Sequence, residues 1–346
     1  MRKPFALPAL LLTVLLALPA LLAAFALLSA PLARAADNGN WSVYPASSGA
    51  SARPYFYLAA APGATLRDQV TVTNKTAAPL NLRLYGADAY NTERDGGFAV
   101  RAEQEKQSGV GAWVRPERSA ITVPARSSLA VPFTLAVPED AEPGDHVGAL
   151  VALDDRIAPG PAASGKVAVG LRQAVGARVY LRVGGPTVPA LAVENVRLSQ
   201  HRPLVPGAGE SRTDITYTLH NRGNVTLSPK VALRATGLFG RTLLSRDPAA
   251  VPAELLPGQR VTLTETWRGS PQLDWGHVTL TASAKDAKGS AGASFLALPW
   301  LALVVLAAAA LAFTAHRVVR RRAGRRRRAI GTAARRPSAR LTSADT

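Results

Sequence analysis

The longest apolar stretch outside the N-terminal segment lies near the end of the chain. Residues 295–315 are almost wholly Leu, Ala, Val and Phe, and no charged side chain occurs from Gly289 to His316 at neutral pH. At about 1.5 Å per residue, a helix over this stretch spans roughly 31 Å, close to the thickness of a bilayer's hydrocarbon core. The pattern predicts a transmembrane helix at residues 295–315.

Arginines crowd the residues that follow this apolar stretch. They are Arg317, Arg320, Arg321, Arg322, Arg325, Arg326, Arg327 and Arg328. Positive charge flanking a span marks its cytoplasmic side, and such a cluster binds anionic lipid at about 1 kcal/mol per residue. We expect a single-pass cell-membrane protein with a basic cytoplasmic tail at residues 316–346 and everything before the span outside.

The N-terminus has the pattern of an export signal. Arg2 and Lys3 precede an apolar run at residues 5–28, and Ala33-Arg34-Ala35 fits a small-x-small cleavage site. This predicts a secretory signal peptide over residues 1–35. The apolar run is long, so an uncleaved signal anchor remains open, and either form exports the next segment.

Between these apolar segments the pattern is that of strands. Apolar and polar residues alternate at 80–84 and 129–137, and Pro, Gly, Asn and Ser recur every ten or so residues. A period of two with frequent turn residues is typical of antiparallel strands with one buried face. We therefore predict an all-β fold, in which Ig-like sandwiches are the commonest packing.

The strand pattern occurs twice. A strand, a turn that begins at Asn74 and a second strand at residues 70–85 parallel a similar series around Asn221 at residues 215–233. Two tandem β-sandwiches explain this repetition. We assign them to residues 36–185 and 186–287, separated at a Gly-Gly-Pro sequence, and we assign residues 288–294 to a stalk.

Most of the net positive charge lies outside the predicted sandwiches. The chain carries a net charge of +18, of which the tail from His316 accounts for +10 and the N-terminal segment for +3. The middle of the chain lacks a basic face with interleaved aromatic residues, which argues against nucleic acid as a partner. There are no cysteines, so disulfides and thiolate chemistry are excluded.

No residue pattern indicates catalysis. His146, His201, His220 and His277 show neither zinc-site spacing nor a nearby nucleophile motif. The acidic residues near Asp88 and Asp95 are best interpreted as turn formers. We expect no catalytic residue, no metal site and no cofactor, and hence a protein that is not an enzyme.

Aromatic residues gather in the first third of the exported region. Exposed Tyr and Trp rings can form a binding platform, although each ring can equally fill the sandwich core. The candidates for ligand binding are Trp41, Tyr55, Tyr57, Tyr90 and Trp113.

An ordered series of motifs carries a family resemblance. The series includes Trp41-Ser42-Val43-Tyr44-Pro45, Ala61-Pro62-Gly63, Trp113-Val114, Ile121-Thr122-Val123-Pro124 and Pro143-Gly144-Asp145-His146. Over residues 41–183 it resembles the N-terminal peptidoglycan-binding domain of WxL-interacting proteins. The resemblance implies a Gram-positive surface protein whose first sandwich binds peptidoglycan and whose second binds a WxL-type or other surface protein.

These patterns leave a main hypothesis and two alternatives. The main one is a non-enzymatic, membrane-anchored cell-envelope protein that binds peptidoglycan. The alternatives are a membrane-tethered scaffold or chaperone-like module that binds only proteins, and a wall-modifying enzyme. A sortase substrate would carry Leu-Pro-x-Thr-Gly before the span, whereas Leu298-Pro299-Trp300 lacks the Thr-Gly.

Overall fold

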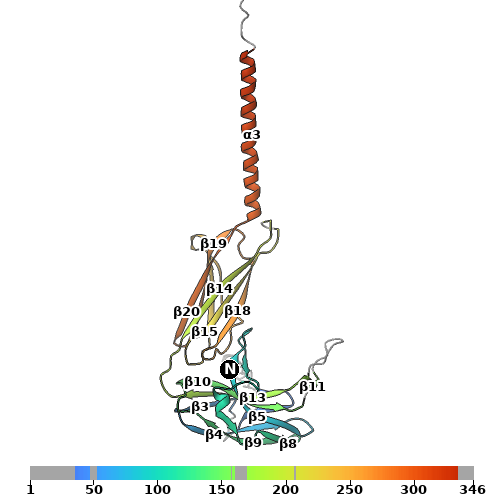
Figure 1. Cartoon of the computed structure of the whole chain (residues 1–346), viewed down its shortest axis with the longest axis vertical. Coiled ribbons are helices and arrows are strands. Elements are labelled where there is room, and N and C mark those ends of the chain that lie inside the picture. The colour runs from blue at the N-terminus through green and yellow to red at the C-terminus, as the bar shows by residue number, and fades with distance from the viewer. Residues whose placement is uncertain (1–35, 47–52, 157, 160–169, 206–207, 334–346) are drawn as a thin grey trace, which may run out of the picture. The chain divides into compact units, whose positions relative to one another are not determined.

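A computed structural model describes residues 36–46, 53–156, 158–159, 170–205 and 208–333 (Figure 1). The predicted signal peptide therefore lies outside the described residues, as does the tail beyond Ala333. The chain divides into two compact units. The first comprises residues 1–90 and 98–188, and the second comprises residues 91–97 and 189–346.

The first unit is a β-sandwich. One sheet has the order β1-β2-β4-β9-β7, and the other has the order β3-β13-β10-β5-β6, with β8 also paired to β5. The strands are β1 (Ala36–Asp37), β2 (Trp41–Pro45), β3 (Phe56–Ala60), β4 (Thr65–Asn74), β5 (Leu80–Asn91), β6 (Phe98–Val100), β7 (Val114–Pro116), β8 (Ala120–Val123), β9 (Ser128–Ala136), β10 (Gly144–Asp154) and β13 (Ala174–Val183). A small hairpin of β11 (Ala158–Pro159) and β12 (Gly170–Leu171) and a one-turn helix, α2 (Val110–Trp113), complete the unit.

Alternating apolar residues build the core of this sandwich. Val70 and Val72 of β4 lie opposite Val131 and Leu129 of β9, and Leu80, Leu82 and Leu84 of β5 face them from the other sheet. The strand β10 departs from the expected alternation because both of its faces are covered. Ala149 and Val151, on its outer face, pack with Ala87 in a second, small apolar cluster.

The second unit is a seven-stranded Ig-like sandwich followed by a helix. Its sheets have the orders β14-β15-β18 and β17-β16-β19-β20. The elements are β14 (Leu191–His201), β15 (Arg212–Asn221), β16 (Lys230–Thr236), the short 3-10 turn η1 (Leu238–Gly240), β17 (Thr242–Arg246), β18 (Arg260–Arg268), β19 (Asp274–Ala284), β20 (Ala287–Ala297) and α3 (Trp300–Ala333). The fold class expected from the sequence, two β-sandwiches and one C-terminal helix, is confirmed.

The segment before the helix differs from the prediction. Residues 288–294, assigned to a stalk, form the middle of β20, which pairs with β19 over its whole length. Phe295, assigned to the membrane span, is buried against Trp267, with ring centroids 5.8 Å apart. Small Ala, Gly and Ser residues resemble a linker in sequence, but here they pair as an ordinary strand.

One helix is long and apolar enough to cross a membrane. The segment Leu303–Arg321 of α3 meets this test by length and composition. The side chains described along this segment are exposed, so α3 has no protein core to bury them. Arg317, Arg320 and Arg321 lie at the C-terminal end of this segment, and Arg322 and Arg325 to Arg328 follow it on the same helix.

Candidate functional site

The structure separates the five aromatic candidates. Trp41 is fully buried in the core of the first sandwich, where its ring fills the space between the sheets. The prediction that Trp41 binds a ligand is therefore wrong. Tyr90 is half-buried on β5. Trp113 is half-buried at the end of α2, where its ring packs against that of His146 at 4.7 Å between centroids.

The remaining two candidates come together with a third tyrosine. The rings of Tyr57 and Tyr180 are stacked, with centroids 5.2 Å apart and planes at 14°. Tyr55 meets both edge-on, at 6.1 Å from Tyr57 and 5.8 Å from Tyr180. Tyr57 is the most exposed member, with 67% of its surface accessible.

Arg178 ties these rings to a fourth aromatic residue. Its guanidinium carbon lies 4.0 Å from the ring centroid of Phe98 and 5.4 Å from that of Tyr55. Its Nη1 atom donates a hydrogen bond to the hydroxyl of Tyr180 at 3.2 Å. We call Tyr55, Tyr57, Phe98, Arg178 and Tyr180 the aromatic patch.

Strand register explains why these residues meet. Alternation along β13 buries Val179 and Leu181 and turns Arg178 and Tyr180 to the outer face. The strand β3 runs parallel to β13 with Tyr57 as the partner of Tyr180, which places the two rings side by side. Neither Arg178 nor Tyr180 was among the sequence candidates, although the polar alternation at residues 178, 180 and 182 marks an outer face.

The polar clusters in the described part of the chain have structural roles. The carboxylate of Asp88 accepts hydrogen bonds from the backbone N–H groups of Ser108, Gly109 and Gly111, and so holds the loop before α2. Hydrogen bonds from His220 and Arg222 lower the pKa of Glu194. No group of three or more His, Asp or Glu suited to a metal ion occurs among the described residues.

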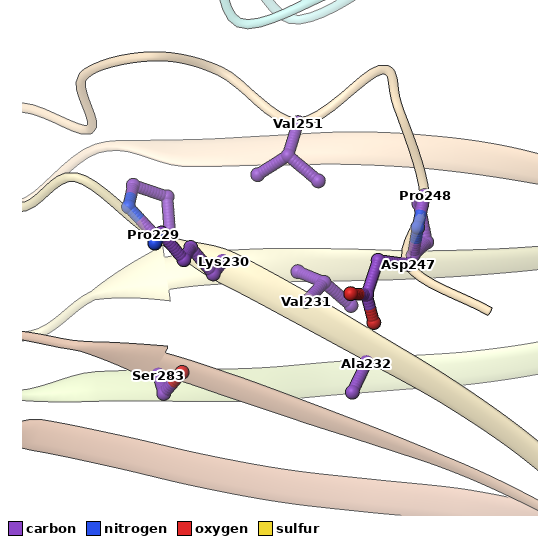
Figure 2. A pocket seen from close by; sticks show the side chains of 8 residues that line it. All are labelled: Pro229, Lys230, Val231, Ala232, Asp247, Pro248, Val251 and Ser283. Atoms are coloured by element: carbon purple, nitrogen blue, oxygen red, sulfur yellow. The ribbon is translucent and has the colours of Figure 1, made fainter. Parts of the chain in front are cut away.

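A shallow pocket of about 360 Å³ lies beside β16 in the second sandwich. It opens where β17 stops pairing and the chain leaves at Asp247 and Pro248, and Val251 lies across it from Val231 (Figure 2). Of the residues that line it, Val231 belongs to the sandwich core and Val251 packs against that core. The charged groups at its border, Lys230 and Asp247, provide no convergent set of donors and acceptors, so the pocket makes a weaker site than the aromatic patch.

Comparisons with known proteins find matches only among solved structures. No family model and no curated protein matches the chain. A chaperone–tip adhesin complex of CFA/I fimbriae matches with 12% identity and a TM-score of 0.34, covering 75% of this chain and 98% of the other. The class 5 fimbriae chaperone CfaA matches with 12% identity and a TM-score of 0.31, covering 74% and 98%. The Escherichia coli chaperone DraB matches with 9% identity and a TM-score of 0.29, covering 73% and 98%.

At these TM-scores the likeness concerns the kind of fold alone. The expected relationship to WxL-interacting proteins is wrong: no family model matches the chain, and the solved structures named above come from fimbrial chaperones. The predicted peptidoglycan-binding function, which depended on this resemblance, is also wrong. The strand and turn motifs that carried the resemblance are general features of β-sandwiches, and one of the five aromatic candidates, Trp41, is in the core. The Gram-positive source inferred from the same resemblance is likewise unsupported.

Proposed function

We propose that this chain is a membrane-tethered, non-enzymatic protein-binding module of the scaffold or chaperone-like kind, which contacts another surface protein through the aromatic patch. The observation that carries the proposal is the stacked pair Tyr57 and Tyr180, held by Arg178 on the outer face of the first sandwich.

The composition of the patch suits a protein partner. Tyr and Arg are enriched among the residues that contribute most to protein–protein affinity. A Tyr ring buries much area with only two rotatable side-chain bonds, and the planar guanidinium of Arg offers several donors in a fixed geometry. Here the rings and Arg178 already contact one another. Binding therefore loses little side-chain entropy, which favours affinity.

The strand beside the patch offers a second kind of contact. Among the described strands, β3 lies at the end of its sheet. An end strand presents backbone donors and acceptors to which an extended segment of a partner can add. A partner strand laid along β3 would run directly beside Tyr57.

The helix α3 supports the proposed tether and its orientation. The apolar segment Leu303–Arg321 supplies the span, and the arginines from Arg317 onward favour a cytoplasmic C-terminus. The two sandwiches then lie on the outer side of the membrane, where a surface protein is accessible. We include the absence of enzymatic activity in the proposal, since the buried carboxylates Asp88 and Asp274 are occupied in holding loops.

Site-specific photo-crosslinking in the producing cells tests the patch. A photoreactive phenylalanine analogue replaces Tyr57, and the matched control carries it at Thr122, an exposed position of β8 in the same sandwich. We expect discrete protein adducts at position 57 that are absent at position 122. Their gel mobility should not change on muramidase treatment, which distinguishes a protein from wall fragments.

A second substitution tests whether crosslinking at position 57 depends on the aromatic patch. Arg178→Ala removes the contacts to Phe98 and Tyr55 and should abolish the adduct at position 57, while circular dichroism shows that the protein remains folded. Equal adducts at positions 57 and 122, or an adduct that persists in Arg178→Ala, would overturn the proposal.

A further inference from the structure

Exposed apolar side chains are concentrated at one end of the second sandwich. Among the described residues before α3, nine large apolar side chains are exposed, and seven of them lie in or beside the loops at the end where β20 passes into the helix. They are Leu204, Val205, Leu238, Phe239, Leu273, Trp275 and Leu296. We call these seven residues the apolar rim.

Strand pairing places these residues at one end. His201, the last residue of β14, pairs with Arg212, the first of β15, so the loop that contains Leu204 and Val205 leaves from this end. Asp274, the first residue of β19, pairs with Ala297, the last of β20. The next pair inward is Trp275 and Leu296, whose side chains lie on the same outer face.

Hydrogen bonds connect the described parts of two of these loops to each other and to the end of β20. The guanidinium of Arg202 donates to the carbonyls of Leu296 and Leu298, at 3.4 and 3.3 Å. The side chain of Gln272 donates to the carbonyl of Gly209 at 3.1 Å. Leu204, Leu273 and Leu296 therefore lie on segments that are joined at this end of the sandwich.

Phe239 is the most exposed residue of the rim. Its side chain is as accessible as in an extended chain, at 103%, and its backbone is left-handed with φ at 57°. The buried carboxylate of Asp274 fixes this turn by accepting hydrogen bonds from the backbone N–H of Leu238 at 3.0 Å and from Arg241 at 2.8 Å. A well-anchored turn thus presents a bare phenyl ring to the surroundings.

The short connection to α3 keeps the rim close to the membrane. Only two residues separate Ala297 from Trp300, and three extended links cover at most about 11 Å. The apolar span begins three residues later, at Leu303, or about 4.5 Å further along the helix. Headgroup layers are roughly 5 to 8 Å thick on each side of the hydrocarbon core, so this end lies at or near the membrane surface.

Charges around the rim also suit a lipid surface. Arg202, Arg212, Arg241 and Arg268 lie at this end. The acidic groups there are the exposed Glu210, Asp214, which is paired with Arg212 at 3.2 Å, and the buried Asp274, which is paired with Arg241. Arginines can extend their guanidinium groups to phosphates while their stems cover apolar surface. At the other end of the sandwich, the turn between β19 and β20 exposes Lys285 and Asp286 instead.

We propose that the apolar rim docks the second sandwich onto the outer leaflet of the membrane that α3 crosses, with Phe239, Leu273 and Trp275 in the interfacial layer. We assign lipid rather than a protein as the occupant of this surface, because the short connection from Ala297 to Trp300 keeps the rim close to the lipid headgroups. The inference rests on the proposed function, which supplies the membrane span.

The chain contains no cysteine, so single-cysteine variants can be labelled at chosen positions. Full-length Phe239→Cys, Lys285→Cys and Phe313→Cys proteins, each carrying an environment-sensitive fluorophore, are reconstituted in phosphatidylcholine–phosphatidylglycerol vesicles with nitroxide-labelled lipid. Residues of an interfacial face sit about 5 to 10 Å into the headgroup and acyl boundary, so the label at position 239 should lose about half of its fluorescence. The label at position 285 should keep its fluorescence, and the label at position 313 should be strongly quenched.

The outcomes separate this inference from the proposed function. Quenching at position 313 without quenching at position 239 overturns the docking and leaves the tether intact. Absence of quenching at position 313 removes the tether and, with it, the docking. As a second measurement, Leu273→Cys should repeat the result at position 239, and a fluorescent label there that remains fully exposed to an aqueous quencher would also contradict the docking.

Discussion

At the scale of single residues, two asparagines close the same corner in both sandwiches. Asn74 donates through Nδ2 to the carbonyls of Ala78 and Val123, and its Oδ1 accepts from the N–H of Thr76. Asn221 donates in the same way to Val225 and Leu255. Its Oδ1 accepts from Gly223, so the residue spacings of four and two agree at both corners. These shared hydrogen bonds are the physical basis of the repeated strand–turn–strand pattern in the sequence.

We expect Asn221→Ala to lower the free energy of unfolding of the second sandwich by about 2 kcal/mol, because two carbonyls lose their donor in a buried site. Asn74→Ala should have a similar effect on the first sandwich. Denaturant unfolding of the purified full-length protein measures both. Asn81→Ala, at an exposed position on β5, is the matched control and should change stability by less than about 0.5 kcal/mol. A loss at Asn81 as large as at Asn221 would contradict this account.

Asp274 should make the stability of the second sandwich depend on pH. The hydrogen bond from Leu238 and the pairing with Arg241 hold the pKa of this carboxyl below its usual range. A lowered pKa means that the stabilisation is present at neutral pH and is lost as the pH falls through the normal aspartate range toward the folded-state value.

Thermal unfolding of the wild-type protein and of Asp274→Asn, measured from pH 7 downward, tests whether this stabilisation is lost as the pH falls. The variant keeps an oxygen for the N–H of Leu238 but loses the charge that pairs with Arg241. Its Tm should be lower at pH 7, and the difference should narrow toward about pH 3. Asp286→Asn, in an exposed turn, serves as the control. A difference that widens on acidification would show that the pKa is raised instead.

At the scale of elements, β20 shows where sequence patterns mislead. Its residues 289–294 are Gly, Ser and Ala, which suggested a linker, and Phe295 began the apolar run that suggested a membrane helix. Both predictions are wrong for these residues because the segment pairs with β19: each residue gains a partner in the sheet, and alternate residues face the core. The helix then begins five residues later than expected, at Trp300.

The position of Phe295 can be tested directly. Phe295→Ala should reduce the free energy of unfolding of the second sandwich by about 3 kcal/mol, because it leaves a cavity beside Trp267. The neighbouring residue Leu296 points the opposite way and is exposed, so Leu296→Ala in detergent should cost less than about 0.5 kcal/mol. Equal effects of the two substitutions would mean that the strand does not continue to this point.

At the scale of the whole molecule, the proposed location of the two sandwiches depends on the helix α3. Its apolar side chains have no protein partner among the described residues, so a lipid phase is the environment that would remove them from water. The basic segment beyond them sets the expected orientation. The tether would keep the aromatic patch on the outer side of the membrane, available to surface proteins.

Leu306 lies within the apolar part of α3 and is exposed. Leu306→Arg places a charge in the span at a cost of about 2.5 to 3.5 kcal/mol, so it should shift a large share of the protein into the alkaline-extractable fraction of membranes. Leu306→Val is the control and should remain in the membrane pellet. If the Arg variant resists extraction as well as the control, α3 does not span the bilayer.

The sequence by itself determined the order and kind of the elements: an apolar N-terminal segment, two sets of alternating strands and an apolar helix before a basic tail. These depend on periodicity and local composition, which can be read along the chain. Tertiary structure alone decided which alternating residues share a surface. Tyr57 and Tyr180 are far apart in the chain and meet because β3 pairs in parallel with β13. Trp41 had the same claim to a binding role in sequence, but the packing of the two sheets buries it. Pairing and burial depend on contacts between distant segments, and that is why the aromatic patch and the apolar rim became visible only in the folded chain.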